Sequence, residues 1–349
     1  MIPDDRIDSF IRLGRWLKAF SSTPENVKYA ELYYIVKKAA IANPWFTISN
    51  ILMSFKALGE MLESEKVLRW MTPYRDRLDP SHQPRVVGLV MAGNIPAVGF
   101  HDLLCVLAAG DTVKVKLSSS DQLLIPSITR CLTELEPAWN NRIEYVTETL
   151  SGFDAVIATG NDNTARYFEY YFGKYPHIIR KNRNSIAVLT GNETSHQLKE
   201  LAGDILHYFG LGCRSVSKLF LPKTFDKQRI INELIPFSNY LDHHKFANNH
   251  QYRKTILTMN NVPHTDAGPL LWVEDRTIAS PIGVIHYEFY DDLSVLANRL
   301  EQEKDQIQCI VGESTLPFTT VSFGKAQSPE LWDYADQIDT MDFLLSINE

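Results

Sequence analysis

Hydrophobic residues in the N-terminal quarter of the chain follow the spacing of helices. They recur every three or four positions in residues 7–20 and again in residues 30–41, and a third set occupies residues 52–62. Asn43 and Pro44 interrupt the pattern between the second set and the third. We therefore expect residues 4–80 to form a helical N-terminal segment whose aromatic side chains lie mainly in the core.

The pattern changes after Arg85. Residues 86–93, VVGLVMAG, form a short apolar run that ends in glycine, as is typical of a buried parallel strand. Residues 100–109 have a helical pattern that ends at Gly110, and residues 112–117 alternate as a second strand. This order predicts one βαβ unit.

Apolar runs and helical patterns continue to alternate along the rest of the chain. Further strands are expected at residues 143–146, 155–159, 185–189, 270–273, 283–289 and 308–311. The polar turn at residues 160–164 would cap a helix that begins near Ala165, and residues 291–303 have one apolar helical face. Alternation of this kind predicts a doubly wound parallel sheet, which binds ligands at the carboxyl ends of its strands.

Composition narrows the class of protein. A length of 349 residues suggests about two domains, and a net charge of -7 argues against nonspecific nucleic-acid binding. The beginning of the chain carries early acids and no apolar secretory segment, and no apolar run is long enough to span a membrane. We therefore expect a cytoplasmic protein with no membrane span and no nucleic-acid partner.

Cysteine and histidine spacing argues against a metal site. The four cysteines include no CxxC pair, which disfavours zinc and a redox dithiol and suits a reducing cytosol. The one histidine cluster is expected to be solvated or to pack in the fold, because its spacing matches no metal motif. Its members are His243, His244, His250 and His264.

The stretch at residues 206–222, LHYFGLGCRSVSKLFLP, carries the main candidate for chemistry. Cys213 follows Gly210 and Gly212, which leave the backbone free to turn and keep bulk away from the sulfur. A thiol in this setting is a candidate nucleophile, because sulfur forms thioesters and releases them readily. The alternative interpretation is a small buried hydrophobic residue.

Three segments, taken in order, resemble the aldehyde dehydrogenase superfamily. Residues 88–121 resemble its Asn-x-Pro turn, the helix after it and a strand that closes in a Lys-Pro-Ser segment. Residues 153–165 resemble its turn before a cofactor helix, and residues 208–222 resemble its cysteine segment. The resemblance extends over residues 85–325. The ordinary GxGxxG dinucleotide motif is absent, since Gly88, Gly93 and Gly99 have another spacing.

The resemblance implies a role for several residues. Cys213 would be the nucleophile, and the side-chain amide of Asn94 would join the backbone N–H of Cys213 in an oxyanion hole. Read without the resemblance, Asn94 is a turn residue before proline and Lys116 an exposed strand residue. The implied cofactor contacts are Lys116 (to the adenosine ribose), Ser118, Gly160, Asn161 and Thr164.

Departures from the superfamily pattern refine the expectation. Residues 177–191 stand where hydrolytic members carry a water-activating glutamate, and they offer Arg180 and Lys181 instead. The thioester on Cys213 should therefore pass to another thiol and not to water. Residues 278–287 lack the glutamate that holds the nicotinamide ribose. Arg180 and Lys181 either attract CoA or cofactor phosphates or form a solvated basic loop.

These departures resemble the LuxC-type long-chain acyl-CoA reductases. The resemblance implies an α/β, aldehyde dehydrogenase-like fold of two doubly wound domains, for cofactor and catalysis, after helical N-terminal residues. We expect residues 1–205 to contain the cofactor domain and residues 206–318 the catalytic domain. Residues 319–349 would return to the first domain or form an oligomer interface.

The predicted function is NAD(P)H-dependent reduction of an acyl-CoA, expected to be long-chain, to the aldehyde through a Cys213 thioester. NADPH is the expected cofactor and NADH the alternative. A homo-oligomer and an acyl-transferring protein partner are expected. Three alternatives stay open. They are a reductase of short acyl-CoA or acyl phosphate, a cofactor-free cysteine hydrolase or acyltransferase with His207 as base, and a noncatalytic scaffold.

Overall fold

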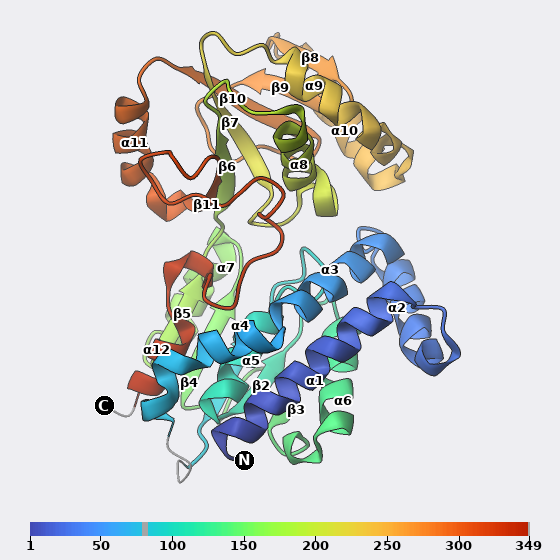
Figure 1. The fold of residues 1–349 in the computed structure, drawn as a ribbon, viewed down its shortest axis with the longest axis vertical. Helices are drawn as coiled ribbons and strands as arrows, with labels where there is room; N and C mark the ends of the chain where they lie inside the picture. Colours follow the sequence, from blue (N-terminus) through green and yellow to red (C-terminus); the bar gives the residue numbers. More distant parts are fainter. Residues whose placement is uncertain (79–82, 348–349) are drawn as a thin grey trace. The chain divides into compact units, whose positions relative to one another are not determined.

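The computed structural model describes residues 1–78 and 83–347 and divides into two compact units. The first contains Met1–Asn182 and the C-terminal segment from Ser328, and the second contains Arg183–Gln327 (Figure 1). This division lies earlier in the chain than the expected boundary at residue 206. The reason is that β6 (Asn184–Val188) pairs with β7 (Val216–Pro222), and α8 (Ser195–Leu206) packs against β7.

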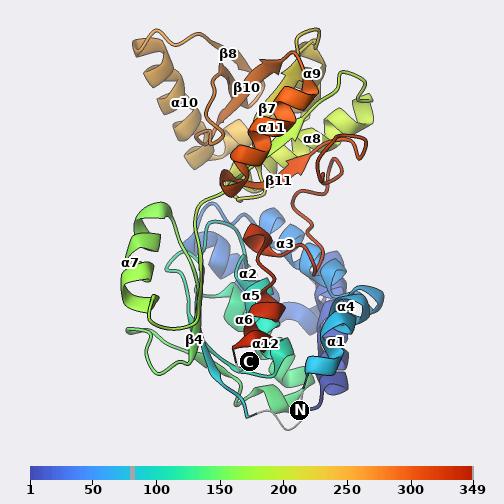
Figure 2. The same cartoon turned by 90° about the vertical axis from the view of Figure 1, so that its left-hand side faces the viewer.

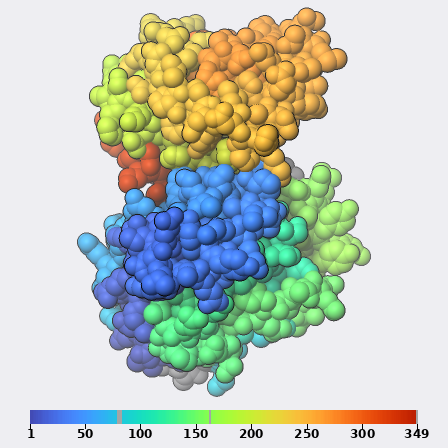
Figure 3. Space-filling view, turned by 90° about the vertical axis from the view of Figure 1, so that its right-hand side faces the viewer, coloured from blue at the N-terminus to red at the C-terminus, as the bar shows by residue number. Residues whose placement is uncertain are grey.

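The N-terminal segment is helical, as predicted. Its main helices are α1 (Pro3–Ser22), α2 (Ala30–Ala42), α3 (Ile48–Met61) and α4 (Ser64–Met71). Residues 79 and 80, the end of the predicted segment, lie outside the described residues. Glycine lets α1 and α3 approach closely, because a Cβ at Gly14 would lie 2.5 Å from the Cβ of Leu62. Figure 3 shows these helices, in blue, as a continuous surface of the first unit.

The first unit is built on a five-stranded parallel sheet of order β3-β2-β1-β4-β5. The order reverses between β1 and β4, so the carboxyl ends of these two strands form the switch point at which such sheets bind ligands. The strands are β1 (Val86–Val90), β2 (Thr112–Lys116), β3 (Ile143–Tyr145), β4 (Ala155–Thr159) and β5 (His177–Arg180).

Helices connect these strands. They are α5 (Phe100–Ala109) between β1 and β2, α6 (Leu124–Leu135) between β2 and β3, and α7 (Asp162–Phe172) between β4 and β5. Strands β1 to β4 and helix α5 confirm the sequence prediction. Strand β5 was missed, because its four residues end in Arg180 and were interpreted as part of a basic segment.

The second unit contains a six-stranded sheet of order β11-β6-β7-β10-β9-β8. All its pairs are parallel except β8–β9, so β8 is an antiparallel edge strand that the sequence pattern did not reveal. The remaining strands are β8 (His264–Ala267), β9 (Leu270–Glu274), β10 (Val284–Tyr290) and β11 (Ile307–Val311). Besides α8, its helices are α9 (Gln228–Leu234), α10 (His244–Met259) and α11 (Leu293–Gln302).

The C-terminal part of the chain belongs to both units in turn. Val321 makes an isolated parallel bridge to Val311 of β11, and residues 319–324 form no full strand. From Ser328 the chain joins the first unit, where α12 (Thr340–Ser346) packs on α5 (Figure 2). The last two residues of the predicted tail, 348 and 349, are not among those described. Among residues 1–78 and 83–347, no helix has both the length and the apolar character needed to span a bilayer.

Candidate functional site

Cys213 lies in a tight turn between α8 and β7, at the amino end of β7. The Ser215 N–H donates to the Gly212 carbonyl at 2.9 Å, and the Gly212 N–H donates to Ser215 Oγ at 3.2 Å. These two bonds close the turn around Cys213 and Arg214. We call residues 212–215 the nucleophile turn. The backbone of the candidate nucleophile is thus fixed by bonds on both of its sides.

Exposure separates the four cysteines into two pairs. Cys213 and Cys309 are partly exposed, whereas Cys105 and Cys131 are buried. Burial raises the pKa of Cys105 well above its ordinary value and raises that of Cys131 to about 12. The thiolate is the reactive form, so Cys105 and Cys131 are poor nucleophiles at neutral pH. This leaves Cys213 and Cys309 as the candidates.

A strained backbone leads into the nucleophile turn. Tyr208, Phe209 and Gly210 have φ of 55°, 58° and 71°, all in the left-handed region. For Tyr208 and Phe209 such a conformation costs on the order of 1–3 kcal/mol each. Only the third position carries the glycine that this region favours. The strain therefore lies directly before the predicted nucleophile.

Aromatic packing holds this strained segment in place. Phe209 is buried, and its ring centroid lies 4.5 Å from that of His243, 4.9 Å from that of Tyr240 and 5.7 Å from that of Phe246. His243 also accepts the Phe246 N–H at the start of α10. The packing role predicted for the histidine cluster is confirmed for His243. The described residues contain no group of His, Cys, Asp and Glu that could hold a metal ion.

A serine on β6 connects the two partly exposed cysteines. Ser185 Oγ donates to the Cys213 carbonyl at 3.0 Å and lies 3.1 Å from Cys309 Sγ on β11. Both cysteines therefore lie within hydrogen-bond distance of one hydroxyl. Sequence reasoning missed Ser185 and Cys309, because their contacts span 28 and 124 residues and follow only from the strand order β11-β6-β7.

His207, the alternative base, packs inside the second unit. Its ring lies against Gly203 and meets Phe237 edge-on at 6.1 Å. Burial lowers the pKa of His207, so the imidazole is neutral at neutral pH. A neutral, packed imidazole is typical of a core histidine. The role of His207 as a base stays a prediction.

Asn94 lies in the turn that follows β1 in the first unit. It is exposed, while its neighbours are anchored: Ser54 Oγ donates to the Pro96 carbonyl at 2.8 Å, and the Ala97 N–H donates to Asp121 at 2.9 Å. Ala97 has a φ of 56°, so this turn is strained as well. Burial raises the pKa of Asp121. The buried carboxylate is a support of the Asn94 turn that sequence reasoning did not find.

A groove of about 680 Å³ opens beside the carboxyl ends of β1 and β2. Lys116, a predicted cofactor contact, lines it, and its ammonium donates to the carbonyls of Thr147 and Glu148 at 2.5 and 2.6 Å. This lysine therefore ties β2 to the loop after β3. The groove is lined by Val90, Lys116, Glu148, Thr149, Leu150, Phe168 and Phe172.

The aromatic side of this groove comes from α7. Phe168 and Phe172 stack with centroids 5.8 Å apart, one helical turn from each other. Sequence reasoning missed both, although their i,i+4 spacing in the expected helix is a readable signal. Ser118 lies close to the Asn94 turn, since a Cβ at Gly93 would come within 2.5 Å of Ser118 Oγ.

The polar turn before α7 caps that helix. Asn161 is the N-cap, and its side chain accepts the Thr164 N–H at 2.9 Å and the Thr164 hydroxyl at 2.8 Å. The helix begins at Asp162, three residues before the expected Ala165. Gly160 is tightly packed, because a Cβ there would lie 2.7 Å from Thr164 Oγ1. The first turn of α7 presents N–H groups of the kind that bind phosphate.

Arg180 is an interior residue, contrary to its predicted phosphate contact. It is 3% exposed and pairs with Asp102 through Nη2–Oδ1 at 2.7 Å and Nε–Oδ2 at 3.3 Å. It also donates to the Ala335 carbonyl and to Thr340 Oγ1. A guanidinium engaged in this way is not available to a phosphate from solvent. Lys181 is exposed, and its phosphate contact stays a prediction.

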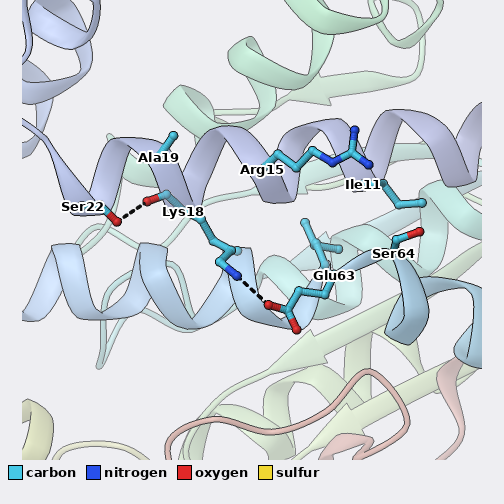
Figure 4. A pocket seen from close by; sticks show the side chains of 9 residues that line it. Ile11, Arg15, Lys18, Ala19, Ser22, Glu63 and Ser64 are labelled. Carbon is cyan, nitrogen blue, oxygen red and sulfur yellow. Dashed lines mark hydrogen bonds and ion pairs between the residues drawn. The ribbon is translucent and has the colours of Figure 1, made fainter.

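A second groove, of about 450 Å³, lies between α1 and the α3–α4 junction (Figure 4). Its polar centre is an ion pair, with Lys18 Nζ 2.5 Å from Glu63 Oε1. The side-chain hydroxyl of Ser22 donates to the Lys18 carbonyl. None of the predicted site residues lines this groove.

Comparison with solved structures shows the aldehyde dehydrogenase fold. Aldehyde dehydrogenase 21 from Physcomitrella patens, in complex with succinate, is 10% identical with a TM-score of 0.68, covering 99% of this chain and 84% of its own. An NAD-dependent aldehyde dehydrogenase from Sinorhizobium meliloti is 14% identical with a TM-score of 0.63, covering 90% and 71%. An aldehyde dehydrogenase from Bacillus cereus with NAD+ is 13% identical with a TM-score of 0.61, covering 89% and 72%.

Comparison at the level of sequence identifies the family. No curated protein sequence matches the chain. The sequence model of the family described as "Acyl-CoA reductase (LuxC)" matches residues 40–235, which is more than half of the chain and includes both Asn94 and Cys213. The chain therefore belongs to the LuxC family of acyl-CoA reductases.

Proposed function

We propose that this acyl-CoA reductase converts a long-chain acyl-CoA to the aldehyde through a thioester on Cys213, with NADPH as the hydride donor and NADH as the alternative. The observation that carries the proposal is the setting of Cys213: a partly exposed thiol in a closed turn, in a chain of the LuxC family. The closed turn supports catalysis, because a fixed nucleophile avoids the entropy cost of ordering it during the reaction.

Cys213 would act twice. Its thiolate attacks the carbonyl carbon of the acyl-CoA, the C–S bond to CoA breaks, and CoA leaves as a thiolate that takes a proton from solvent. After hydride addition to the same carbon, the Cys213 C–S bond breaks, which releases the aldehyde and restores the thiolate. One acyl-CoA, one hydride and one proton thus give one aldehyde and one CoA. The bound cofactor supplies the hydride.

Negative charge develops on the carbonyl oxygen in both steps. We assign its stabilisation to the side-chain amide of Asn94 and to the backbone N–H of Cys213. The hydrogen bonds that hold the backbone around Asn94 and around Cys213 agree with this role. Asp121 and Ser54 bond to the turn of Asn94, and Ser185 bonds to the Cys213 carbonyl.

The first unit offers residues that suit a nicotinamide dinucleotide. Phe168 and Phe172 provide aromatic faces for the adenine, and Lys116 lies in the same groove for the ribose. Gly160, Asn161 and Thr164 form the start of α7, where N–H groups suit the pyrophosphate. Ser118 lies beside the Asn94 turn. The similar structures from Sinorhizobium meliloti and Bacillus cereus are an NAD-dependent enzyme and an NAD+ complex, in line with this assignment.

Three features stay predictions: a cytoplasmic location, a homo-oligomer and an acyl-transferring protein partner. Short acyl-CoA and acyl phosphates are the competing substrates, because each forms the same thioester. A cofactor-free hydrolase and a noncatalytic scaffold are the competing classes, and both lack a use for the groove at Lys116.

The test is mass spectrometry of the intact protein after mixing with a long-chain acyl-CoA, without cofactor. We expect an acyl adduct in the wild type and in Cys309→Ala, and no adduct in Cys213→Ala. Addition of NADPH should remove the adduct and release one aldehyde per adduct. An adduct on Cys309 alone, or none with any acyl-CoA, would contradict the proposal. Loss of the adduct without aldehyde would indicate a hydrolase.

A further inference from the structure

A segment far along the chain contacts the nucleophile turn directly. It comprises residues 324–327, which end the second unit, and we call it the clasp. The clasp lies more than one hundred residues after Cys213, yet four hydrogen bonds connect it to the turn and to the helix before the turn. All of these residues belong to the second unit.

One end of the clasp is anchored on a buried carboxyl group of α8. Asp204 is 1% exposed, and each of its oxygens accepts a separate backbone N–H. Oδ2 accepts from Gly324 at 2.7 Å and Oδ1 accepts from Ala326 at 3.0 Å. Gly324 has a φ of 76°, which lets two N–H groups so close in sequence face one side chain. The side chain of Asp204 thus fixes the clasp backbone in a defined conformation.

The other side of the clasp binds the nucleophile turn. Arg214, which follows Cys213, donates its Nε–H to the Ala326 carbonyl at 2.5 Å. Gln327 donates from its side-chain amide to Ser215 Oγ at 3.0 Å. The same Ser215 oxygen accepts the Gly212 N–H that helps to close the turn. Bonds from the clasp thus reach the turn at two positions after Cys213.

The bonds from the clasp act on the part of the chain that carries the Cys213 N–H, the proposed oxyanion donor. The Cys213 N–H belongs to the nucleophile turn, which is closed by the two bonds between Gly212 and Ser215. A donor stabilises an oxyanion only where it points at the developing charge, and a misplacement of about 1 Å costs on the order of 100-fold in rate. Bonds that set the turn therefore set the oxyanion donor.

We propose that the clasp is a positioning element for acyl transfer to Cys213, in which Asp204 fixes residues 324–327, and Arg214 and Gln327 hold the nucleophile turn so that the Cys213 N–H points at the oxyanion. This inference rests on the proposed thioester mechanism. Asp204, Arg214 and Gln327 touch neither substrate nor cofactor in this role. They act through the backbone of Cys213.

The test compares four proteins in single turnover with a long-chain acyl-CoA: wild type, Gln327→Ala, Ser215→Ala and the double variant. We expect Gln327→Ala to lower the rate of Cys213 acylation at least tenfold, with KM for acyl-CoA within about threefold of wild type. Alkylation of Cys213 by iodoacetamide should change less than about threefold, because that reaction needs no oxyanion donor. In the Ser215→Ala background, Gln327→Ala should add little, since Gln327 acts through Ser215.

The controls separate positioning from folding and from the mechanism itself. Lys199→Ala changes an exposed residue on the same helix as Asp204 and should acylate at the wild-type rate. Asp204→Asn, which keeps the size of the side chain, should reduce acylation as Gln327→Ala does. If the wild type forms the adduct and the variants acylate at the same rate, the proposed role of the clasp is wrong and the thioester mechanism stands. A wild type that forms no adduct would overturn both.

Discussion

Arg180 and Asp102 form a two-point ion pair inside the first unit, at 2.7 and 3.3 Å. Asp102 lies in the first turn of α5, and Arg180 ends β5. The same guanidinium bonds to Ala335 and Thr340 of the C-terminal segment. One buried cation therefore joins three parts of the chain that are distant in sequence.

The substitution Asp102→Asn should lower the free energy of unfolding by about 3–5 kcal/mol. It removes the negative partner and leaves a buried positive charge without compensation. Chemical denaturation followed by circular dichroism would measure the change. Lys56→Ala is the matched control, because it breaks a surface pair with Glu60 at 3.8 Å and should cost less than about 1 kcal/mol. Equal losses in the two variants would contradict the structural role given to Arg180.

Asn94→Ala should lower the rate of Cys213 acylation by about 100- to 1,000-fold, as loss of one oxyanion donor does. Thermal unfolding should change little, because Asn94 is exposed. Asp121→Ala should lower both the rate and the melting temperature, since the buried carboxylate supports the backbone at Ala97 and Leu124. If Asn94→Ala acylated at the wild-type rate, the oxyanion assignment would fail.

Phe168→Ala should raise the Kd for the nicotinamide cofactor about tenfold or more. The loss corresponds to about 1–3 kcal/mol for a base stacked on an aromatic ring. Tyr170→Ala, at an 83% exposed position on the same helix, should leave the Kd unchanged. Fluorescence titration with NADPH and with NADH would measure both variants and would also rank the two cofactors in the wild type. An unchanged Kd in Phe168→Ala would exclude the groove as the adenine site.

Because of Asp204, the free energy of unfolding should fall as pH rises from about 4 to about 7. Burial raises its pKa from an ordinary value of 3.8 to about 7, so between these values the folded protein holds a proton that the unfolded chain releases. The stability that this proton contributes is complete below pH 4 and is lost as pH passes 7. Glu200 and Arg214 are the charged groups that act on it.

Calorimetry of wild type and Asp204→Asn from pH 5 to 8 would measure this effect. We expect the difference in melting temperature, variant minus wild type, to increase as pH rises from 5 to 8. The wild type loses the stability that the Asp204 proton contributes, whereas the amide of the variant does not titrate. A difference between the two proteins that stays constant with pH would contradict a raised pKa for Asp204.

Local sequence patterns were sufficient for much of the fold. The apolar run after Arg85 and the glycine at position 110 defined β1 and α5, because buried strands and helix ends depend on neighbouring residues. The glycines around Cys213 likewise indicated an unusual backbone, and Gly210 does adopt a left-handed φ. Features that depend on residues close together in the sequence could therefore be predicted from the sequence alone.

Contacts between residues far apart in the sequence could not be predicted in this way. Asp204 meets Gly324 across 120 residues, and Arg180 meets Asp102 across 78. A charged residue has the same appearance in a sequence whether it is solvated or buried. Arg180 was therefore interpreted as either a phosphate contact or part of a solvated basic loop, whereas it is buried. Only the pairing of strands brings such partners together, and this pairing is a property of the whole sheet.

The division of the first unit between the two ends of the chain has a consequence for synthesis on the ribosome. Residues 183–327 form a continuous unit, so they can fold as soon as they emerge. The first unit cannot finish at that stage, because Trp70, Tyr74 and Arg180 bond to Tyr334, Asp339 and Thr340, which follow the second unit in the chain. The first unit, whose synthesis begins before that of the second, is therefore completed only after the second unit has been made.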